Sequence, residues 1–198
     1  MHLIDPVPLH REQAMAEGRF TVAAGDARSL EEDDSSYDAV LLLGPLYHLT
    51  ERADRIRALS EARRVTRPDG VVAAAVISRY ASTFDGFFRG FIDQPGFTAI
   101  MTEDLTTGQH RNLAAHPGFF TTAYLHDRAG IADEIANSGL HLTDLLPIEG
   151  PLHWAPGIGD RLADPGERQL ILDTLAAMEH DPAIAGATAH LLAVGRHA

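Results

Sequence analysis

Two residue types are missing from the 198-residue sequence, which contains no cysteine and no lysine. Without cysteine, the chain can form no disulfide, no thiolate metal site and no cysteine nucleophile. Without lysine, it can have neither a Schiff-base lysine nor the lysine of a phosphate-binding loop. These two absences exclude several classes of enzyme before any motif is considered.

Positive charge is also scarce, with 16 arginines against 28 acidic residues and a formal net charge of −12. A chain of this charge repels polyanions, which argues against nucleic acid as a partner. The N-terminus has no signal-peptide pattern, and no apolar run approaches the roughly 20 residues that span a bilayer. We therefore expect a cytoplasmic protein with no membrane contact, and a homodimer stays open.

The composition, with 45% hydrophobic and 22% charged residues, is that of a globular protein. Short apolar runs alternate with helical stretches, which predicts an α/β fold with a single domain over residues 1–198. Strands are expected at 2–4, 20–24, 37–43, 71–77, 141–148 and 190–195, and helices at 9–17, 51–67, 128–138 and 168–179. The run 37–43 is so apolar that we expect a strand buried on both faces. Residues 81–127 have no clear period and are expected to form a lid or acceptor-binding insertion.

Three small or acidic residues come directly after predicted strands, where open α/β sheets bind their ligands. Asp5 follows the first strand, Asp26 the second and Gly44 the third. A carboxylate in the first position can accept hydrogen bonds from both ribose hydroxyls, and one in the second can accept from an adenine amino group. Each acid can equally be a turn former or a helix cap. Their separation by a helix and a strand favours a shared nucleoside site.

The run from Leu3 to Tyr80 resembles the core of the class I S-adenosylmethionine-dependent methyltransferases, especially the small-molecule enzymes of the type 11 kind. The resemblance is carried by Asp5-Pro6, Gly25-Asp26-Ala27, the run from Tyr37 through Gly44-Pro45-Leu46-Tyr47-His48 and, most specifically, Arg64-Val65-Thr66-Arg67-Pro68-Asp69-Gly70. It implies a Rossmann-like sheet with helices on both faces, S-adenosylmethionine as cofactor, and a small-molecule methyl acceptor. It also implies that the cofactor is bound by Asp5, Pro6, Gly25, Asp26, Ala27, Leu43, Gly44 and Pro45.

One motif of that family is missing. The glycine-rich turn after the family's first strand begins about 20 residues before the acid that Asp5 matches. Only four residues precede Asp5. We therefore expect a chain truncated at its N-terminus, without the first strand and the glycine-rich loop, with the lid after the fifth strand retained. The neighbours of the missing central strand would expose unpaired backbone groups, which predicts low stability and leaves activity in question.

The acceptor side offers candidate catalytic residues. Methyl transfer from a sulfonium is an in-line displacement, so positioning and exclusion of water can supply much of the catalysis. An acceptor that must lose a proton also needs a general base, for which histidine is suited. Tyr47 and His48 match the family's loop that faces the methyl group, so we predict that they contact the acceptor, with His48 as a candidate base. The alternative for His48 is a residue that only packs or caps a helix.

Further histidines and aromatics fall in or near the expected lid. They are His110, His116, His126, His153 and Trp154, each of which can also be an ordinary packing residue. No spacing among the histidines matches a metal motif, so no metal is expected. Phe84, Phe87, Phe88, Phe91 and Phe97 are explained by core packing or lid closure, and a lid of this kind favours a moderately apolar acceptor.

Two other functions stay open. A nicotinamide-dependent Rossmann oxidoreductase would share the acid after a strand, although the Tyr-x-x-x-Lys of the short-chain type cannot be written without lysine. A non-catalytic remnant that binds a nucleoside or serves as an interaction module is favoured by the missing glycine turn. The main expectation is methyl transfer from S-adenosylmethionine to a small organic acceptor.

Overall fold

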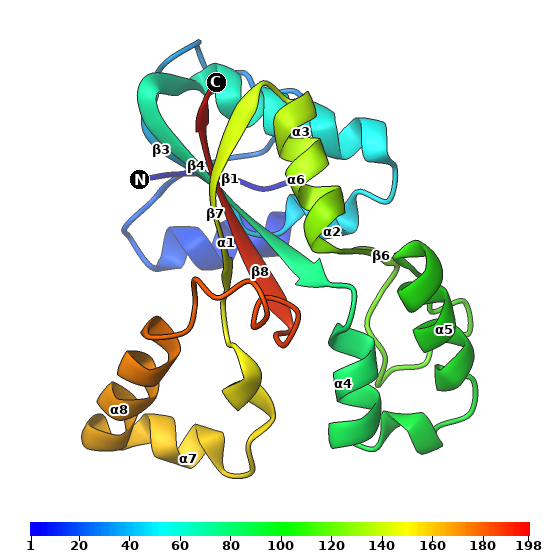
Figure 1. The fold of residues 1–198 in the computed structure, drawn as a ribbon. Helices are drawn as coiled ribbons and strands as arrows, with labels where there is room; N and C mark the ends of the chain where they lie inside the picture. Colours follow the sequence, from blue (N-terminus) through cyan, green and yellow to red (C-terminus); the bar gives the residue numbers. More distant parts are fainter.

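The strands of the chain form two separate sheets (Figure 1). The computed structural model describes all 198 residues. The smaller sheet contains β1 (His2–Ile4) and β2 (Thr21–Ala23), and the larger contains β3 (Tyr37–Leu42), β4 (Thr66–Ser78), β5 (Gln109–His110), β6 (Ala123–His126), β7 (Leu140–Pro147) and β8 (His190–His197). The helices are α1 (Pro8–Ala16), α2 (Pro45–His48), α3 (Arg52–Val65), α4 (Ala81–Phe88), α5 (Phe97–Thr107), α6 (Arg128–Asn137), α7 (Ile158–Ala163) and α8 (Pro165–Ala176), with 3-10 turns η1 (Phe91–Asp93) and η2 (Pro151–Trp154).

β4 is the centre of the larger sheet. It pairs in parallel with β3 and β6 and antiparallel with β8, which pairs antiparallel with β7. β8 occupies one edge of β4 from Val72 to Ile77, so β3 and β6 share the other edge. β6 pairs with Ile77 and Ser78, beyond the end of β3. The predicted α/β architecture is confirmed, and a short strand from the predicted lid continues the sheet past the end of β3.

The main core packs α3 and α6 against β4 and β8. It contains 14 buried residues, among them Leu59 and Ala62 of α3, Ile131 and Ile135 of α6, Val72 and Val76 of β4, and Leu191 and Ala193 of β8. The helical spacing of the apolar residues in α3 explains why this helix buries one face. At the start of α6, the Asp127 side chain accepts a hydrogen bond from the Gly130 N–H and caps the helix.

The turn between α3 and the buried part of β4 needs glycine. Residues 68–70 were predicted to separate helix from strand, but β4 already begins at Thr66 and pairs irregularly with β3 until Val71. A β-carbon at Gly70 would lie 2.5 Å from Thr66 Cγ2 and 2.7 Å from the Asp38 carbonyl oxygen. This close approach excludes any larger side chain at Gly70.

The prediction that β3 is buried on both faces is wrong. Of its six residues only Leu42 is buried, and Leu41 is 56% exposed. The physical reason is that β3 pairs with β4 on one edge only, while β1 pairs only with β2 in the smaller sheet. The apolar sequence of β3 therefore lacks the neighbouring strand and side chains that would cover it.

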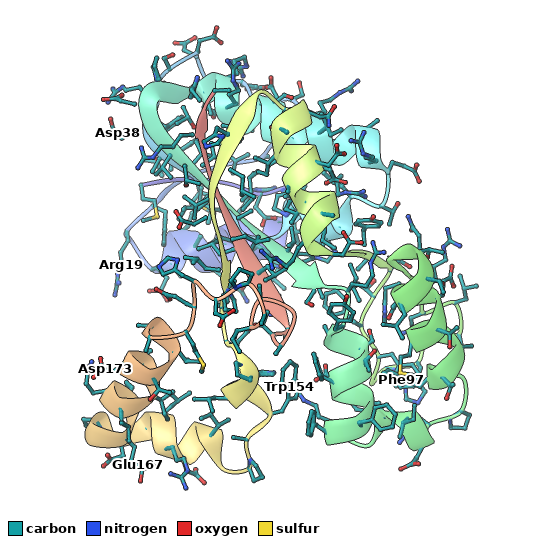
Figure 2. All side chains as sticks on the ribbon, in the orientation of Figure 1. Arg19, Asp38, Phe97, Trp154, Glu167 and Asp173 are labelled. Carbon is teal, nitrogen blue, oxygen red and sulfur yellow. The ribbon has the colours of Figure 1, made fainter.

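Two helical segments extend beyond the sheet. One contains α4 and α5 and follows β4, and the other contains α7 and α8 and follows β7 (Figure 1). Figure 2 shows Trp154 on η2 beside α4, where its ring lies 4.5 Å from that of Phe84, between ring centroids. The indole Nε1–H donates to Asp85 Oδ1 at 3.2 Å. The expected lid over residues 81–127 thus contains α4, α5, β5 and β6, and its role as a lid stays a prediction. None of the helices combines the length and the apolar character needed to cross a membrane.

Candidate active site

Asp5 lies directly after β1. Its N–H donates to the Ala23 carbonyl of β2 at 3.2 Å, and its Oδ1 accepts from the Val7 N–H at 2.7 Å. Its Oδ2 lies 3.2 Å from Nδ1 of His10, whose side chain is 56% exposed. Asp5 therefore forms the turn that starts α1, and its second oxygen faces a partner at the surface that another donor can replace. Pro6 is exposed beside it.

Gly25, Asp26 and Ala27 form the turn after β2. A β-carbon at Gly25 would lie 2.5 Å from Ile4 Cγ2, so the turn packs directly on the end of β1. Hydrogen bonds from the Arg28 side chain and backbone lower the pKa of Asp26 to about 2. The Ala27 N–H donates to no group of the chain. The turn thus presents a charged carboxylate and a free backbone donor next to each other.

Arg28 connects this turn to the segments that follow β3. One of its terminal nitrogens lies 2.6 Å from Asp26 Oδ2 and the other 2.8 Å from Oδ2 of Asp54, in the first turn of α3. No backbone pairing joins β1 to β3. The structure therefore brings Asp5 and the Asp26 turn together, and it links that turn through side chains to the start of α3, which follows the loop carrying Gly44.

α2 is a single turn that begins directly after Gly44, at Pro45. Leu46 is fully buried in the main core and anchors the turn. The Tyr47 hydroxyl donates to the Leu43 carbonyl at 3.4 Å and would lie 3.7 Å from a β-carbon at Gly44. The side chain of Leu43 is 60% exposed. Tyr47 is thus held over the Gly44 backbone, with space between the two.

The His48 ring packs against two aromatic rings. Its centroid lies 4.7 Å from that of Tyr47 and 6.1 Å from that of Phe120, on which it stacks. Although the residue as a whole is exposed, loss of water around the ring lowers the pKa of His48. Burial raises the pKa of Tyr47. Both side chains are therefore uncharged at neutral pH, and Phe120 from the predicted lid lies against them.

A cavity of about 180 Å³ lies next to Phe120. Its lining consists of Ile77, Ala81, Phe120, Leu125 and Ala189, which are apolar, and Ser82, Asp85, His110 and His190, which are polar. Ile77 is near the carboxyl end of β4, so the cavity lies at the edge of the sheet where the sequence predicts a site. Tyr47 packs against a small cluster of buried apolar residues that includes Ile77 and Leu125 of the cavity lining. The cavity and the loop after β3 are therefore neighbours.

Three polar side chains of the expected lid are buried together beside the cavity. The Ser82 hydroxyl donates to Asp104 Oδ2 at 2.5 Å, and His110 Nδ1 lies 2.9 Å from the same oxygen. Asp104 is fully buried and His110 is 3% exposed. Sequence reasoning named His110 only as one of several lid histidines and missed Ser82 and Asp104. No sequence motif joins them, since Ser82 is on α4 and Asp104 on α5.

His126 does not line the cavity and belongs to a buried polar cluster. Its Nε2 lies 3.1 Å from Glu134, which also forms a buried ion pair with Arg55. Burial lowers the pKa of His126 against the opposing effect of Glu134. Arg55 further donates to the carbonyls of Leu49 and Thr50 at 2.9 and 2.8 Å. This cluster joins α3, α6 and β6 and fixes the backbone directly after Tyr47 and His48.

The other lid residues named from the sequence lie outside the cavity lining. His116 stacks on a neighbouring phenylalanine ring with 4.1 Å between centroids. His153 Nε2 lies 2.8 Å from an Arg89 nitrogen at the surface. Trp154 reaches the rim through its hydrogen bond to Asp85, which does line the cavity. Of these histidines, only His110 belongs to the cavity.

The chain is similar to known proteins in part of its sequence and in its fold. Residues 2–70 match the model of a family described as a methyltransferase domain. The chain is similar to the structure of an S-adenosylmethionine-dependent methyltransferase from Methanosarcina mazei, with a TM-score of 0.61, 11% identity, and coverage of 99% of this chain and 81% of that one. The structure of a methyltransferase from Mesorhizobium loti is similar with a TM-score of 0.60 and 12% identity, and the match covers 98% of this chain and 79% of that one. A methyltransferase from Thermotoga maritima, described as a possible histamine N-methyltransferase, has a TM-score of 0.53 and 14% identity. That match covers 97% of this chain and 70% of that one.

At these identities the structural similarity establishes the fold alone, and the family match concerns residues 2–70. That match spans β1, β2, β3, α2 and α3, and it includes every cofactor-binding residue predicted from the sequence. S-adenosylmethionine is the cofactor that the domain match and the similar structures imply. Residues 2–70 therefore match a methyltransferase domain, and the whole chain has the fold of the S-adenosylmethionine-dependent methyltransferases to which it is similar.

Proposed function

We propose that the chain transfers a methyl group from S-adenosylmethionine to a small organic acceptor. The observation that carries this proposal is the cavity beside Phe120, which adjoins the Tyr47-His48 turn after β3. A cavity of about 180 Å³ suits a small molecule of about one ring. The net charge of −12 also disfavours a nucleic-acid acceptor.

The residues present fit the adenosine part of the cofactor. Asp5 Oδ2 faces only an exposed histidine, so it can accept from a ribose hydroxyl. The unpaired Ala27 N–H can donate to an adenine ring nitrogen, and the Asp26 carboxylate beside it can accept from the adenine amino group. The remaining proposed cofactor contacts are Pro6, Gly25, Leu43, Gly44 and Pro45. The chain contains no glycine-rich turn, so the proposed contacts cover the nucleoside and the region near the methyl group.

When bound, the cofactor supplies an electrophilic methyl group on a sulfonium. The protein's own contribution is to hold the acceptor in line and to exclude water. Tyr47 and His48 are uncharged and packed against Phe120, which suits contact with a moderately apolar acceptor. The Arg55 bonds to Leu49 and Thr50 keep this turn in place. The role of His48 as a base stays a prediction.

Calorimetric titration with S-adenosylhomocysteine tests the cofactor site. We expect saturable binding by the chain and about tenfold weaker binding by Asp5→Asn, because one charged acceptor for the ribose is lost. Asparagine keeps the turn that starts α1, so the effect reports on binding. The matched control is Asp33→Asn, an exposed acid in the same region whose carboxylate makes no hydrogen bond.

Three results would contradict the proposal. Absence of any S-adenosylhomocysteine binding would favour a non-catalytic remnant. Saturable binding of NADH in its place would favour an oxidoreductase. An equal loss of affinity in Asp5→Asn and Asp33→Asn would move the cofactor away from the end of β1.

A further inference from the structure

The buried cluster of Ser82, Asp104 and His110 has an incomplete set of hydrogen bonds. The Ser82 hydroxyl donates to Asp104 Oδ2, and Nδ1 of His110 lies 2.9 Å from the same oxygen of this fully buried carboxyl group. Asp104 Oδ1 and His110 Nε2 are both buried and have no partner in the protein. Unpaired polar atoms of this kind are costly in a folded protein, and either an ordered water or a bound group can satisfy them.

The bond to Asp104 determines which nitrogen of His110 carries the proton. An ionised Asp104 can only accept, and Nδ1 of His110 is then the N–H donor. The neutral ring then has its lone pair on Nε2, the nitrogen without a partner. His110 lines the cavity, and Nε2 is its nitrogen without a partner, although the surrounding atoms cover Nε2 in this structure. His110 therefore keeps a free hydrogen-bond acceptor beside the cavity, and a bound molecule reaches it only if the covering side chains shift.

We propose that this cavity is the acceptor pocket and that His110, oriented by Asp104, removes the proton from a hydroxyl group of the acceptor. The proposal rests on the proposed methyltransferase function. A proton on Nε2 turns His110 into a cation next to the Asp104 carboxylate, so the buried charge gains a counterion instead of losing one. Ser82 donates to the same carboxylate and keeps it aimed at His110. Asp104 and Ser82 are positioning residues, and His110 is the catalytic base.

The chemical step balances without another reactant. The acceptor O–H proton moves to Nε2 of His110, and the oxygen electron pair forms the new O–C bond to the methyl group. The C–S bond of the sulfonium breaks at the same time and its electron pair stays on sulfur, giving a neutral thioether. The proton on His110 then passes to water. The products are a methyl ether, S-adenosylhomocysteine and a proton.

The other histidines near the cavity are less suited to this role. His48 is exposed and has no carboxylate partner among the hydrogen bonds and ion pairs of the structure. His190 also lines the cavity and lies 2.5 Å from Glu149, but its side chain is 39% exposed. His110 alone combines burial, a carboxylate at Nδ1 and an unpaired Nε2.

The pocket also limits the acceptor. Five of its nine lining residues are apolar, and its volume is about 180 Å³. A dry cavity of about 150 Å³ in another protein holds one benzene ring, so this pocket fits a molecule of one ring or of similar size. The geometry therefore points to a small, uncharged acceptor that is mostly apolar and carries a hydroxyl group.

Phenol and anisole are matched probes of this pocket. Phenol can donate its O–H to His110 Nε2, whereas anisole has a methyl group in place of that hydrogen. NMR titration of the full chain, with and without S-adenosylhomocysteine, should give about tenfold tighter binding of phenol. Phenol should shift the methyl signals of Ile77 and Leu125, which line the cavity.

Asp104→Asn tests the orienting carboxylate. The asparagine amide donates to Nδ1, which places the proton on Nε2 and removes the acceptor from the cavity. The preference for phenol over anisole should then fall to about one, with methyl transfer to phenol lost as well. Glu103→Gln is the matched control, because Glu103 is the preceding residue on α5 and pairs with Arg111 at the surface. It should keep both properties.

Each other result overturns the assignment. Equal binding of the two probes by the unaltered chain, or shifts that avoid Ile77 and Leu125, would do so even if Asp104→Asn fails to fold. If Asp104→Asn keeps the preference for phenol over anisole, His110 is not the base. The same conclusion follows if His190→Gln loses this preference while Asp104→Asn keeps it. A chain that binds S-adenosylhomocysteine but shows no phenol preference refutes only the pocket, and a chain with that preference but no S-adenosylhomocysteine binding refutes the methyltransferase function.

Discussion

The regions before and after Leu42 are built in opposite ways. Residues 1–41 contribute no buried residue, whereas residues 42–198 contribute all 38. The first region contains the proposed nucleoside contacts and is held to α3 by polar groups, such as Arg28 with Asp54 and the Leu30 N–H with Glu61. The second region packs α3 and α6 on β4 and contains the proposed acceptor pocket.

This difference shows that polar contacts hold the nucleoside half of the proposed site in place, whereas a buried apolar core holds the acceptor half. Burial of apolar surface is the dominant favourable term in folding, and exposed ion pairs contribute little. The nucleoside side should therefore open locally at a lower free energy than the acceptor side. Paired substitutions, with one buried and one exposed residue in each pair, test this contrast.

The largest effect is expected from Glu134→Gln in the second region. Glu134 is the only carboxylate paired with Arg55, and both are almost fully buried. Removal of its charge leaves a buried guanidinium uncompensated, which should lower the free energy of unfolding by about 3 to 5 kcal/mol. Urea denaturation followed by circular dichroism measures this.

The control for that variant joins the same two helices. Arg52 of α3 pairs with Asp133 of α6 at the surface, with side chains 51% and 58% exposed. Asp133→Asn should cost no more than about 0.5 kcal/mol. Equal losses in the two variants would show that burial does not set the strength of these pairs.

A smaller effect is expected from the apolar core, through Leu59→Ala compared with Leu9→Ala. Leu59 is fully buried on α3, and Leu9 on α1 is 58% exposed. The first change should cost about 2 to 5 kcal/mol because it leaves a cavity, and the second less than about 0.5 kcal/mol. The same urea titration tests both, and a loss above about 2 kcal/mol for Leu9→Ala would contradict the contrast between the regions.

The smallest effect concerns acid and the Asp26–Arg28 pair. Arg28 lowers the folded-state pKa of Asp26 from 3.8 to about 2. The Asp26–Arg28 pair therefore stabilises the folded state above about pH 4, and this stabilisation is lost as the pH falls toward 2. Asp26 is 47% exposed, which limits the contribution to under about 1 kcal/mol. Asp26→Asn should therefore differ from the unaltered chain at about pH 6 but not at about pH 2. A stability difference between Asp26→Asn and the unaltered chain that grows as the pH falls would contradict this prediction.

Much of the fold could be predicted from local patterns. The helical spacing in α3 and the apolar run of β4 agree with the structure because both lie in the main core, where pattern and burial coincide. β3 has an equally apolar sequence but is mostly exposed. Its burial depends on whether a neighbouring strand pairs with its second edge, and local sequence does not contain that information.

The site could be predicted only in part, for a similar reason. Asp5, Gly25-Asp26-Ala27 and Gly44 follow strands, and a residue that follows a strand has a defined place at the edge of a sheet. His110 and Asp104 lie in a segment without a clear period, and they meet Ser82 through the packing of α4 against α5. Contacts between helices of this kind leave no spacing in the sequence.

The contact between Trp154 and α4 has a consequence for the rate of ligand exchange. Trp154 comes from the segment after β7, and it binds Asp85, which lines the cavity. A molecule that leaves on this side must separate two segments that are distant along the chain. The residence time of a methylated product then depends on how fast this hydrogen bond and the contact between the Trp154 and Phe84 rings break. Turnover can therefore be limited by the indole, which takes no part in the bonds that form and break.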